Sequence, residues 1–408
     1  MPLNTGLEWP YRSRILLHLQ VNKFQPGAYI IVEGKEDSDH FYIIQQGRVS
    51  CQKGSGNNKI FLGPGDFLGV VSCFANRPQI ETIIAETEVL VISVKKHQYA
   101  DLIANNTPVA LKIIKTFANR TRQMNDQLTK LTLHKVESDN YEHIFNVAQY
   151  YEKSHKFDVA VFAYYQYLKT RPTGPNLLTA QNKFRALKPK THAVYFEPTP
   201  EMTRQYPQDT MIFAESAPGA EMFIIQSGQV AITKVVNGNE VVLAVLQKGD
   251  MFGEMALLEN KPRSASAIAK TDCTLMVVNR HNFNTMVSTQ PQLISRLTTT
   301  LAERLWSMYR QLDNAKLQEP LDKMIDILSL QLEKQRTDFN TLGSKQKQTD
   351  FTPKDLATMC GLDEQGTGIG IQNLYNDSRF KIIQGKIFIK DITEVYKASF
   401  YARKHILN

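Results

Sequence analysis

The sequence predicts an α+β protein of several domains, with two antiparallel β-barrels, a helical segment between them and a smaller mixed domain at the carboxyl end. Three observations lead to this prediction. Short alternating apolar segments with turns occur twice, around Gly65-Asp66 and Gly249-Asp250, at an offset of about 184 residues. Residues 141–188 carry Tyr, Phe and Ala at helical spacing. From Leu321 onward, helical patterns are followed by a β-hairpin pattern.

Length and composition limit the number of domains and the cellular location that we expect. A chain of 408 residues is too long for one hydrophobic core and predicts about two to four domains. Its four cysteines lack the paired spacing of a zinc site or a disulfide framework. No apolar run approaches the roughly 18 residues of a membrane span, and the amino terminus lacks the pattern of a signal peptide. We therefore expect a cytoplasmic protein without metal or cofactor.

The first barrel is predicted within residues 1–135. A short amphipathic helix is expected over 11–19, and strands are expected where apolar residues alternate between Gly27 and Cys51. Apolar residues at spacings of three and four then predict a long helix over 108–132.

A helical linker is predicted over residues 136–190. Small and aromatic residues follow the order and spacing of one tetratricopeptide repeat, a helix–turn–helix unit, at Ala148, Tyr151, Phe157, Ala160, Tyr164 and Pro172. A single repeat cannot bury its own apolar face, because such solenoids need three or more repeats. We therefore expect a spacer that packs on the barrels, with a partner-binding groove as the alternative.

The second barrel, over residues 191–318, contains the most informative stretch, 249–269. Residues 252–258 have helical composition after a glycine, so free backbone N–H groups would face the barrel mouth and favour an anion. Arg263 offers a fork that matches two phosphate oxygens, whereas the carboxylate of Glu254 must accept hydrogen bonds from hydroxyls. An anionic group beside a hydroxyl group describes a ribose cyclic phosphate.

This stretch closely resembles the phosphate-binding cassette of cyclic-nucleotide-binding domains, as in the catabolite activator (CRP/FNR-like) family and the regulatory subunits of cyclic-nucleotide-dependent kinases. The resemblance implies that Glu254 holds the ribose 2′-hydroxyl and that Arg263 and Ser264 hold the cyclic phosphate. The ligand site that follows comprises Gly253, Glu254, Met255, Ala256, Arg263, Ser264, Ala265, Ile232, Leu243, Arg304 and Met308. The resemblance also implies that the helix over 291–316 caps the base and forms a homodimer. The expected ligand is cAMP, with cGMP as the alternative.

The first copy of this stretch has lost the key residues. Val70, Gln79 and Glu81 stand where Glu254, Arg263 and Ala265 stand in the second copy. Without the hydroxyl acceptor and the phosphate fork, the first barrel is expected to reject a cyclic phosphate. The alternative is a different ligand, for which Arg77 is the nearby cation.

The carboxyl-terminal part, residues 319–408, is predicted to contain helices over 321–332, 353–359 and 372–376, a hairpin over 381–389 and a final helix over 393–407. This order resembles the winged helix, a helix-turn-helix variant, of the catabolite activator family. The stretch 363–370 departs from it, because it is acidic and glycine-rich where a base-reading helix needs Arg, Lys, Asn or Gln.

These features predict a non-enzymatic cyclic-nucleotide receptor of bacterial type, in which ligand in the second barrel repositions the winged helix. The alternatives are a CRP-like DNA-binding transcription regulator, a kinase regulatory subunit, and an adapter that binds proteins through its spacer or winged helix. The sequence has no Arg-Arg-x-Ser inhibitor segment, and its net charge of +8 is spread along the chain. Four histidines without a neighbouring nucleophile give no catalytic site, namely His134, His143, His155 and His192.

Overall fold

The computed structural model describes residues 19–36, 38–54, 59–133, 141–170, 173–197, 199–236, 238–259, 261–335 and 345–407. The chain divides into two compact units. The first comprises Met1–Asn105, Gln123–Lys135 and Leu301–Asn408, and the second comprises Asn106–Arg122 and Val136–Thr300. Residues 11–18 of the helix predicted over 11–19 lie outside the described residues, as do His134 and Pro172, and Leu19 lies in a bend.

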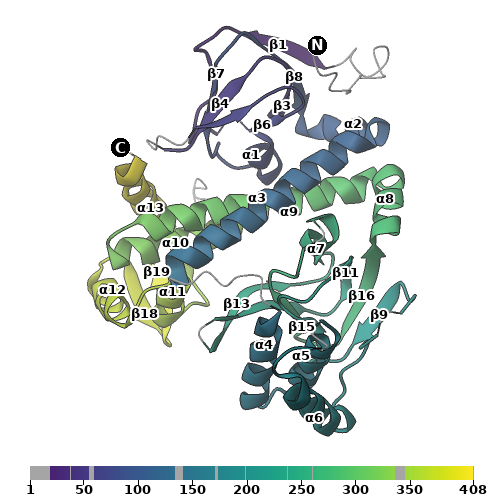
Figure 1. Cartoon of the computed structure of the whole chain (residues 1–408). Coiled ribbons are helices and arrows are strands. Elements are labelled where there is room, and N and C mark those ends of the chain that lie inside the picture. Colours follow the sequence, from purple (N-terminus) through teal and green to yellow (C-terminus); the bar gives the residue numbers. More distant parts are fainter. Residues whose placement is uncertain are drawn as a thin grey trace. The chain divides into compact units, whose positions relative to one another are not determined.

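The first domain is built from two antiparallel four-stranded sheets (Figure 1). Its strands are β1 (Gln20–Phe24), β2 (Tyr29–Ile31), β3 (His40–Gln46), β4 (Val49–Gln52), β5 (Ile60–Leu62), β6 (Phe67–Leu68), β7 (Thr82–Ala85) and β8 (Val89–Lys95). They are ordered β1-β8-β3-β6 and β2-β7-β4-β5. Its helices are α1 (Val70–Ala75), the 3-10 turn η1 (Lys96–Gln98) and α2 (Tyr99–Asn105). Inward-facing Ile, Val and Leu side chains of both sheets form one core.

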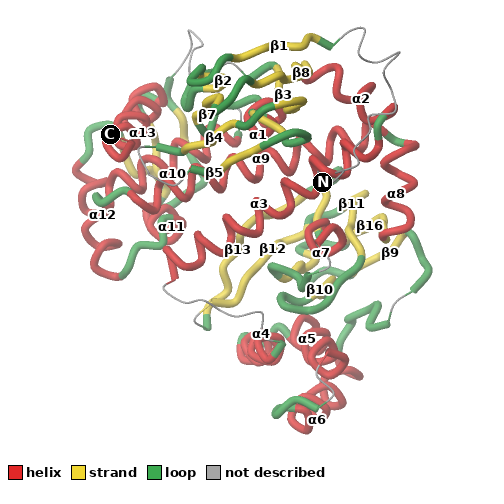
Figure 2. Tube along the Cα trace, turned by 45° about the horizontal axis from the view of Figure 1, so that its top comes forward, coloured by secondary structure: helices red, strands yellow, loops and turns green. Residues whose placement is uncertain are grey.

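The second domain repeats this arrangement. Its strands are β9 (Thr203–Tyr206), β10 (Met211–Phe213), β11 (Glu221–Ser227), β12 (Val230–Val236), β13 (Asn239–Leu246), β14 (Met251–Phe252), β15 (Ser266–Ala269) and β16 (Cys273–Asn279). The sheet orders are β14-β11-β16-β9 and β10-β15-β12-β13, and β12 and β13 form a long hairpin (Figure 2). Helix α7 (Glu254–Glu259) occupies the place of α1, and α8 (Arg280–Thr289) follows the last strand. The predicted pair of antiparallel barrels is therefore present.

Three phenylalanines in the second domain form the floor beneath the predicted ligand site. Phe223 and Phe252 stack with ring centroids 5.3 Å apart, and both lie about 6 Å from the ring of Phe213. Phe223 and Phe252 come from the paired strands β11 and β14, whereas Phe213 ends β10 in the other sheet. This part of the core therefore joins the two sheets below the loop that carries Arg263.

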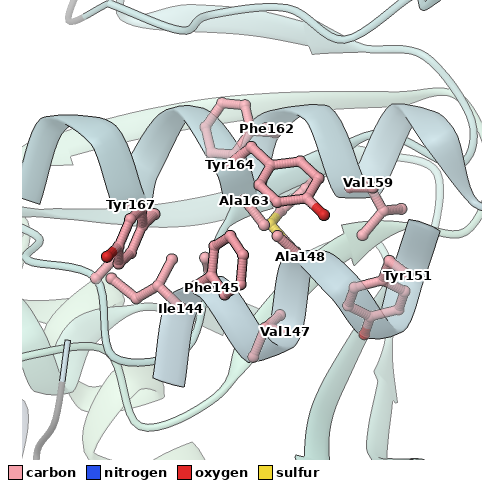
Figure 3. Close-up of a cluster of buried hydrophobic side chains, with 14 of the residues drawn as sticks. Ile144, Phe145, Val147, Ala148, Tyr151, Val159, Phe162, Ala163, Tyr164 and Tyr167 are labelled. Atoms are coloured by element: carbon pink, nitrogen blue, oxygen red, sulfur yellow. The ribbon is translucent and has the colours of Figure 1, made fainter. Parts of the chain in front are cut away.

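The segment between the barrels is helical, as predicted. It contains α4 (Glu142–Lys153), α5 (Phe157–Thr170), α6 (Leu177–Leu187) and the 3-10 turn η2 (Lys188–Lys190). Figure 3 shows Phe145 of α4 beside Tyr164 of α5, with ring centroids 5.8 Å apart. The same cluster includes residues of the second domain such as Met211. The segment is therefore a spacer packed on the second barrel, while its kinship to a tetratricopeptide repeat stays a prediction.

The two long helices are also present, as α3 (Thr107–Leu133) and α9 (Pro291–Lys316). The boundary between the compact units falls inside each helix, because residues of α3 up to Arg122 belong to the second unit and residues of α9 from Leu301 belong to the first. Each helix is therefore shared between the two units.

The carboxyl-terminal domain contains α10 (Pro320–Lys334), β17 (Lys347–Gln348), α11 (Pro353–Met359), α12 (Glu364–Asn376), β18 (Phe380–Ile383), β19 (Lys386–Ile389) and α13 (Ile392–Leu407), with a sheet ordered β17-β19-β18. Thr352 caps α11 by accepting a hydrogen bond from the Asp355 backbone at 3.1 Å, as its position before Pro353 predicts. Gln384 and Gly385 both have positive φ, which suits a two-residue hairpin turn. The order of elements fits a winged helix, which remains a prediction.

The third helix contains residues 372–376, as expected, and also the glycine-rich stretch, because α12 begins at Glu364. Asp363 supports this start because its carboxylate accepts the Gly366 N–H at 2.7 Å. At Gly370, a Cβ would lie 2.8 Å from the sulfur of Met324, so glycine allows α12 to pack closely on α10. Capping and packing thus offset the low helix propensity of glycine.

Within the part of the chain that is described, no helix is both long and apolar enough to cross a membrane. The four cysteines are buried and unbridged, at Cys51, Cys73, Cys273 and Cys360.

Candidate functional site

The segment that contains β14, α7 and the loop before β15 is here called the second cassette (residues 249–265). Backbone hydrogen bonds fix the position of Arg263 within it. The Arg263 N–H donates to the Ala217 carbonyl and its carbonyl accepts the Ser216 N–H, both at 2.8 Å. Gly253 has φ +79°, a left-handed conformation that lets the chain turn from β14 into α7. The backbone therefore fixes where the Arg263 side chain starts and where Glu254 begins α7.

The Arg263 guanidinium is buried at the junction of the cassette and the phenylalanine floor. Its residue is only 6% exposed, its Nη1 donates to the Gly253 carbonyl at 2.7 Å, and its Cζ lies 4.1 Å from the Phe213 ring centroid. Its Nε is buried and has no hydrogen-bond partner among the described residues. A buried donor without a partner costs about 1–3 kcal/mol, and more when it is charged. The site therefore has an unmet capacity to bind an acceptor.

Two glycines make room for this guanidinium. A Cβ on Gly219 would lie 2.2 Å from the Arg263 Nε, and one on Gly253 would lie 2.7 Å from its Nη1. Both distances are too short for non-bonded atoms, so any larger residue would displace the guanidinium. The loop before β11 and the turn before α7 are thus shaped around Arg263.

The electrostatics of the site favour an anion. Burial lowers the pKa of Arg263 to about 10, although the charges of Glu221 and Glu254 act in the opposite direction. Glu221 is already engaged by Arg204, which donates to its two carboxylate oxygens at 3.0 and 2.8 Å. The charge of Arg263 therefore lacks the full compensation that an anionic ligand would supply.

Glu254 is 1% exposed and occupies the first turn of α7, where the helix dipole stabilises a carboxylate. Its charge acts on Arg263, whose guanidinium bonds the carbonyl of the preceding residue, Gly253. Met255 and Ser264 meet across the cassette with Oγ 3.9 Å from Sδ. Ala256 and Ala265 are buried beside them. The structure thus brings together the cassette residues that the sequence singled out.

The other predicted site residues do not join this group in the same way. Ile232 is half-buried on β12. Leu243 is 52% exposed on β13, the edge strand of its sheet, where Val242 and Val245 are exposed as well. Arg304 and Met308 belong to the first compact unit, whereas the cassette belongs to the second. Their part in ligand binding therefore remains a prediction.

Sequence reasoning missed Arg122 of α3. Its Nη2 donates to the Pro262 carbonyl at 3.1 Å, one residue before Arg263, and its side chain is largely buried. The duplication offers a signal for it, since Trp306, 184 residues later, donates from Nε1 to the carbonyl of Pro78, the counterpart of Pro262, at 3.2 Å. In each compact unit, a long helix thus contacts a cassette at the same position.

The corresponding segment of the first domain, the first cassette (residues 65–81), has the same backbone hydrogen bonds but different side chains. The backbone N–H of Gln79 donates to the Lys35 carbonyl at 2.9 Å, and the Gln79 carbonyl accepts the Gly34 N–H at 2.8 Å. The backbone of Arg263 makes the corresponding two bonds with its own neighbours. Val70 and Gln79 are 4% and 6% exposed. The methyl carbon Cδ1 of Ile31 lies 2.8 Å from where a Cβ on Gly69 would be. At the positions of Glu254 and Arg263, this cassette therefore buries an apolar and a neutral side chain.

Among the residues that the structure describes, no cluster of three or more His, Cys, Asp or Glu side chains could hold a metal ion.

Comparison with known proteins agrees with this geometry. The family model for the cyclic nucleotide-binding domain matches residues 21–106 and 203–290. The cyclic AMP receptor protein of Thermus thermophilus is 33% identical over 122 residues, which cover 30% of this chain and 56% of that protein. A cAMP-dependent protein kinase regulatory subunit of Yarrowia lipolytica is 24% identical over 273 residues, covering 67% of this chain and 55% of that protein.

A third relative is the CRP-like cAMP-activated global transcriptional regulator of Mycobacterium tuberculosis, 32% identical over 101 residues that cover 24% of this chain and 45% of that protein. The chain thus spans about half the length of these curated relatives. The matches support a CRP/FNR-like cyclic nucleotide-binding protein with two such domains.

Proposed function

We propose that this chain, with its two cyclic nucleotide-binding domains, is a non-enzymatic receptor whose second cassette binds a cyclic nucleotide. The observation that carries the proposal is the buried Arg263, whose Nε has no partner among the described residues and whose charge is only partly compensated. A cyclic phosphate would accept that hydrogen bond and supply the missing negative charge. Glu254 would accept a hydrogen bond from the ribose 2′-hydroxyl.

The proposed ligand is cAMP, which several relatives carry in their names. The alternative is cGMP, because the phosphate and ribose that Arg263 and Glu254 would hold are common to both nucleotides. Isothermal titration of the full chain with cAMP and cGMP measures this preference. We expect saturable binding that Arg263→Ala weakens at least about tenfold, since one charge-assisted hydrogen bond contributes about 1.5–3 kcal/mol. The matched variant Gln79→Ala in the first cassette should bind as the wild type does.

Binding that persists unchanged in Arg263→Ala would move the ligand site away from the second cassette. Loss of binding in Gln79→Ala with Arg263→Ala unaffected would assign it to the first cassette.

The proposed output is a change in the carboxyl-terminal domain. A ligand shifts such an equilibrium only by its differential affinity for the two states, typically about 1–3 kcal/mol. Two outputs remain candidates because the relatives include transcription regulators and kinase regulatory subunits. For DNA reading, the first turn of α12 offers Glu364 and the capping carboxylate Asp363, which would repel phosphates. We therefore favour contact with a protein, with DNA as the second candidate.

Electrophoretic retention on random and genomic DNA, with and without cAMP, separates these outputs. Nucleotide-dependent retention that weakens steeply with salt would support the hypothesis of a DNA-binding transcription regulator, because phosphate contacts release counterions. No retention in either state would support the hypothesis of an adapter that binds proteins. A homodimer through α9 and a cytoplasmic location also remain predictions, which sedimentation and fractionation test.

A further inference from the structure

The first cassette carries a set of contacts that the proposed function does not use. At its rim, the Trp306 indole donates to the Pro78 carbonyl at 3.2 Å, and the guanidinium carbon of Arg77 lies 5.3 Å from the Trp306 ring centroid. Trp306 is 5% exposed, so α9 covers this rim within the first compact unit. A cation at this distance from an indole ring is attracted to its π-electrons. The cassette thus binds a helix of its own chain.

Arg77 also contacts the next helix. Its Nη2 donates to the Glu333 carbonyl at 2.6 Å, in the last turn of α10. Carbonyls of a last helical turn lack intrahelical partners, and a cation there also complements the helix dipole. Arg77 therefore acts as a cap for the carboxyl end of α10, supplied by a residue about 256 positions earlier in the chain.

Glu333 is held firmly on its other side. Arg310 donates from Nη1 to both of its carboxylate oxygens, at 2.9 and 3.0 Å, and from Nη2 to Asp326 at 3.0 Å. Asp326 is fully buried and also accepts from Ser399 at 2.7 Å and from Arg403 of α13. The contact made by Arg77 therefore reaches a buried ionic network that joins α9, α10 and α13.

A second contact lies at the end of β4. Lys53 forms an ion pair with Asp313 at 3.0 Å, and its ammonium lies 4.7 Å from the Tyr309 ring centroid. Both side chains of the pair are about four-fifths buried; burial lowers the pKa of Lys53, while the charge of Asp313 acts in the opposite direction. Trp306, Tyr309 and Asp313 are spaced three and four apart, so they lie on one face of α9. The first domain thus contacts α9 at two places, at Trp306 and at the pair Tyr309 and Asp313.

We propose that the first cassette is a protein-docking site whose occupant is segment 306–333 of this chain, so that the first domain anchors the carboxyl-terminal domain instead of binding a nucleotide. The counterpart of Arg77 in the second cassette is Lys261, which is exposed. The contacts of Arg77 with Trp306 and Glu333 therefore occur in the cassette that has lost Glu and Arg, whereas in the other cassette Arg122 of α3 reaches the Pro262 carbonyl.

Hydrogen exchange measured by mass spectrometry on the full chain without nucleotide tests this role. In Arg77→Ala, peptides from the end of α10 should exchange about tenfold faster, because a charged hydrogen bond and a cation–π contact are lost. Trp306→Phe, which keeps a ring but removes the N–H, should show a smaller increase in the same peptides. Arg48→Ala is the matched control, since Arg48 is an exposed first-domain cation 4.3 Å from the Phe61 ring centroid.

Unchanged exchange at the end of α10 in both Arg77→Ala and Trp306→Phe would overturn the proposal. An increase spread evenly over the strands of the first domain would overturn it as well, because Arg77 would then support only its own domain. None of these variants touches Arg263 or Glu254, so a negative result leaves the proposed nucleotide site standing.

Discussion

At residues 79 and 263, the backbone makes the same two hydrogen bonds with the neighbouring loop, yet the two side chains have opposite characters. Gln79 is a neutral amide in an apolar cassette, whereas Arg263 is a buried cation with an unpartnered Nε among the described residues. The same backbone hydrogen bonds can therefore hold either a neutral or a charged side chain at this position. A buried, incompletely paired charge lowers stability, and the proposed anionic ligand would compensate the charge of Arg263.

The helix contacts extend this comparison. Arg122 reaches the Pro262 carbonyl and Trp306 reaches the Pro78 carbonyl, from positions 184 residues apart. In the first cassette, Arg77 adds a contact to Glu333 that fixes α10. In the second cassette, the corresponding Lys261 is exposed. The first cassette thus contacts both α9 and α10, whereas the second contacts α3 through Arg122.

The largest expected effect comes from exchanging the two central residues. Protonated Arg263 opposes folding at neutral pH, because burial lowers its pKa in the folded state to about 10, well below the ordinary value of arginine. This penalty is fully present below about pH 10 and fades as the pH rises toward that ordinary value. Arg263→Gln should therefore raise the unfolding free energy of the nucleotide-free protein by about 3 kcal/mol. Urea unfolding at pH 7 measures it.

The reverse exchange, Gln79→Arg, should lower the unfolding free energy in the same assay, because it buries a charge among apolar groups. A loss of stability in Arg263→Gln would contradict the view that Arg263 is uncompensated without ligand.

The next largest effect is expected on cAMP affinity when Glu254 is replaced. Glu254→Gln should weaken cAMP binding about 10- to 100-fold, since a hydrogen bond to a charged acceptor contributes about 1.5–3 kcal/mol. The wild type should lose a similar factor when the ligand is 2′-deoxy-cAMP. Combining the variant with the deoxy ligand should cause little further loss, because both changes remove the same bond. Fully additive losses in calorimetric titrations would separate Glu254 from the 2′-hydroxyl.

Gly219→Ala should weaken cAMP binding about tenfold, by displacing a guanidinium whose charged hydrogen bonds each contribute about 1.5–3 kcal/mol. The physical reason is the 2.2 Å separation between an added Cβ and the Arg263 Nε. Gly63→Ala in the first domain is the control, because a Cβ there meets nothing within 4 Å. Equal affinities of the two variants would show that the space around Arg263 is not limiting.

The smallest effect is expected at the helix contact. Arg122→Ala should weaken cAMP binding about two- to tenfold, because one hydrogen bond to the Pro262 carbonyl contributes roughly 0.5–1.5 kcal/mol to the position of the cassette. Trp306→Phe removes the corresponding bond at Pro78 and should leave the affinity unchanged. If both variants bind cAMP as the wild type does, α3 has no part in the site.

Much of this comparison could be read from the sequence, because it depends on local patterns. The alternating strands, the glycine turns and the helix start at Thr352 and Pro353 are each determined by residues close together in the chain. The duplication and the exchange of Arg263 for Gln79 follow from aligning the two copies. The cassette residues 253–256 and 263–265 are likewise near neighbours, so their proximity followed from one loop.

The remainder depends on contacts between distant segments. The role of Arg77 follows from Trp306 and Glu333, more than 200 residues away. The helical state of the stretch from Glu364 to Gly370 depends on the packing of Gly370 against Met324 of α10. Leu243 is exposed together with Val242 and Val245 on the edge strand β13, and alternation alone does not reveal which strand lies at an edge. Tertiary contacts of this kind leave no periodic pattern in the sequence.

The most direct test of the central claim is the number of nucleotides bound by each chain. Equilibrium dialysis of the full-length wild type with labelled cAMP should reach one mole of nucleotide per mole of chain. That result is expected because the second cassette buries the cation Arg263 at the position where the first cassette carries the neutral Gln79. Two moles per chain at similar affinity would contradict the account, since the first cassette would then bind nucleotide despite its neutral filling and its docked helix.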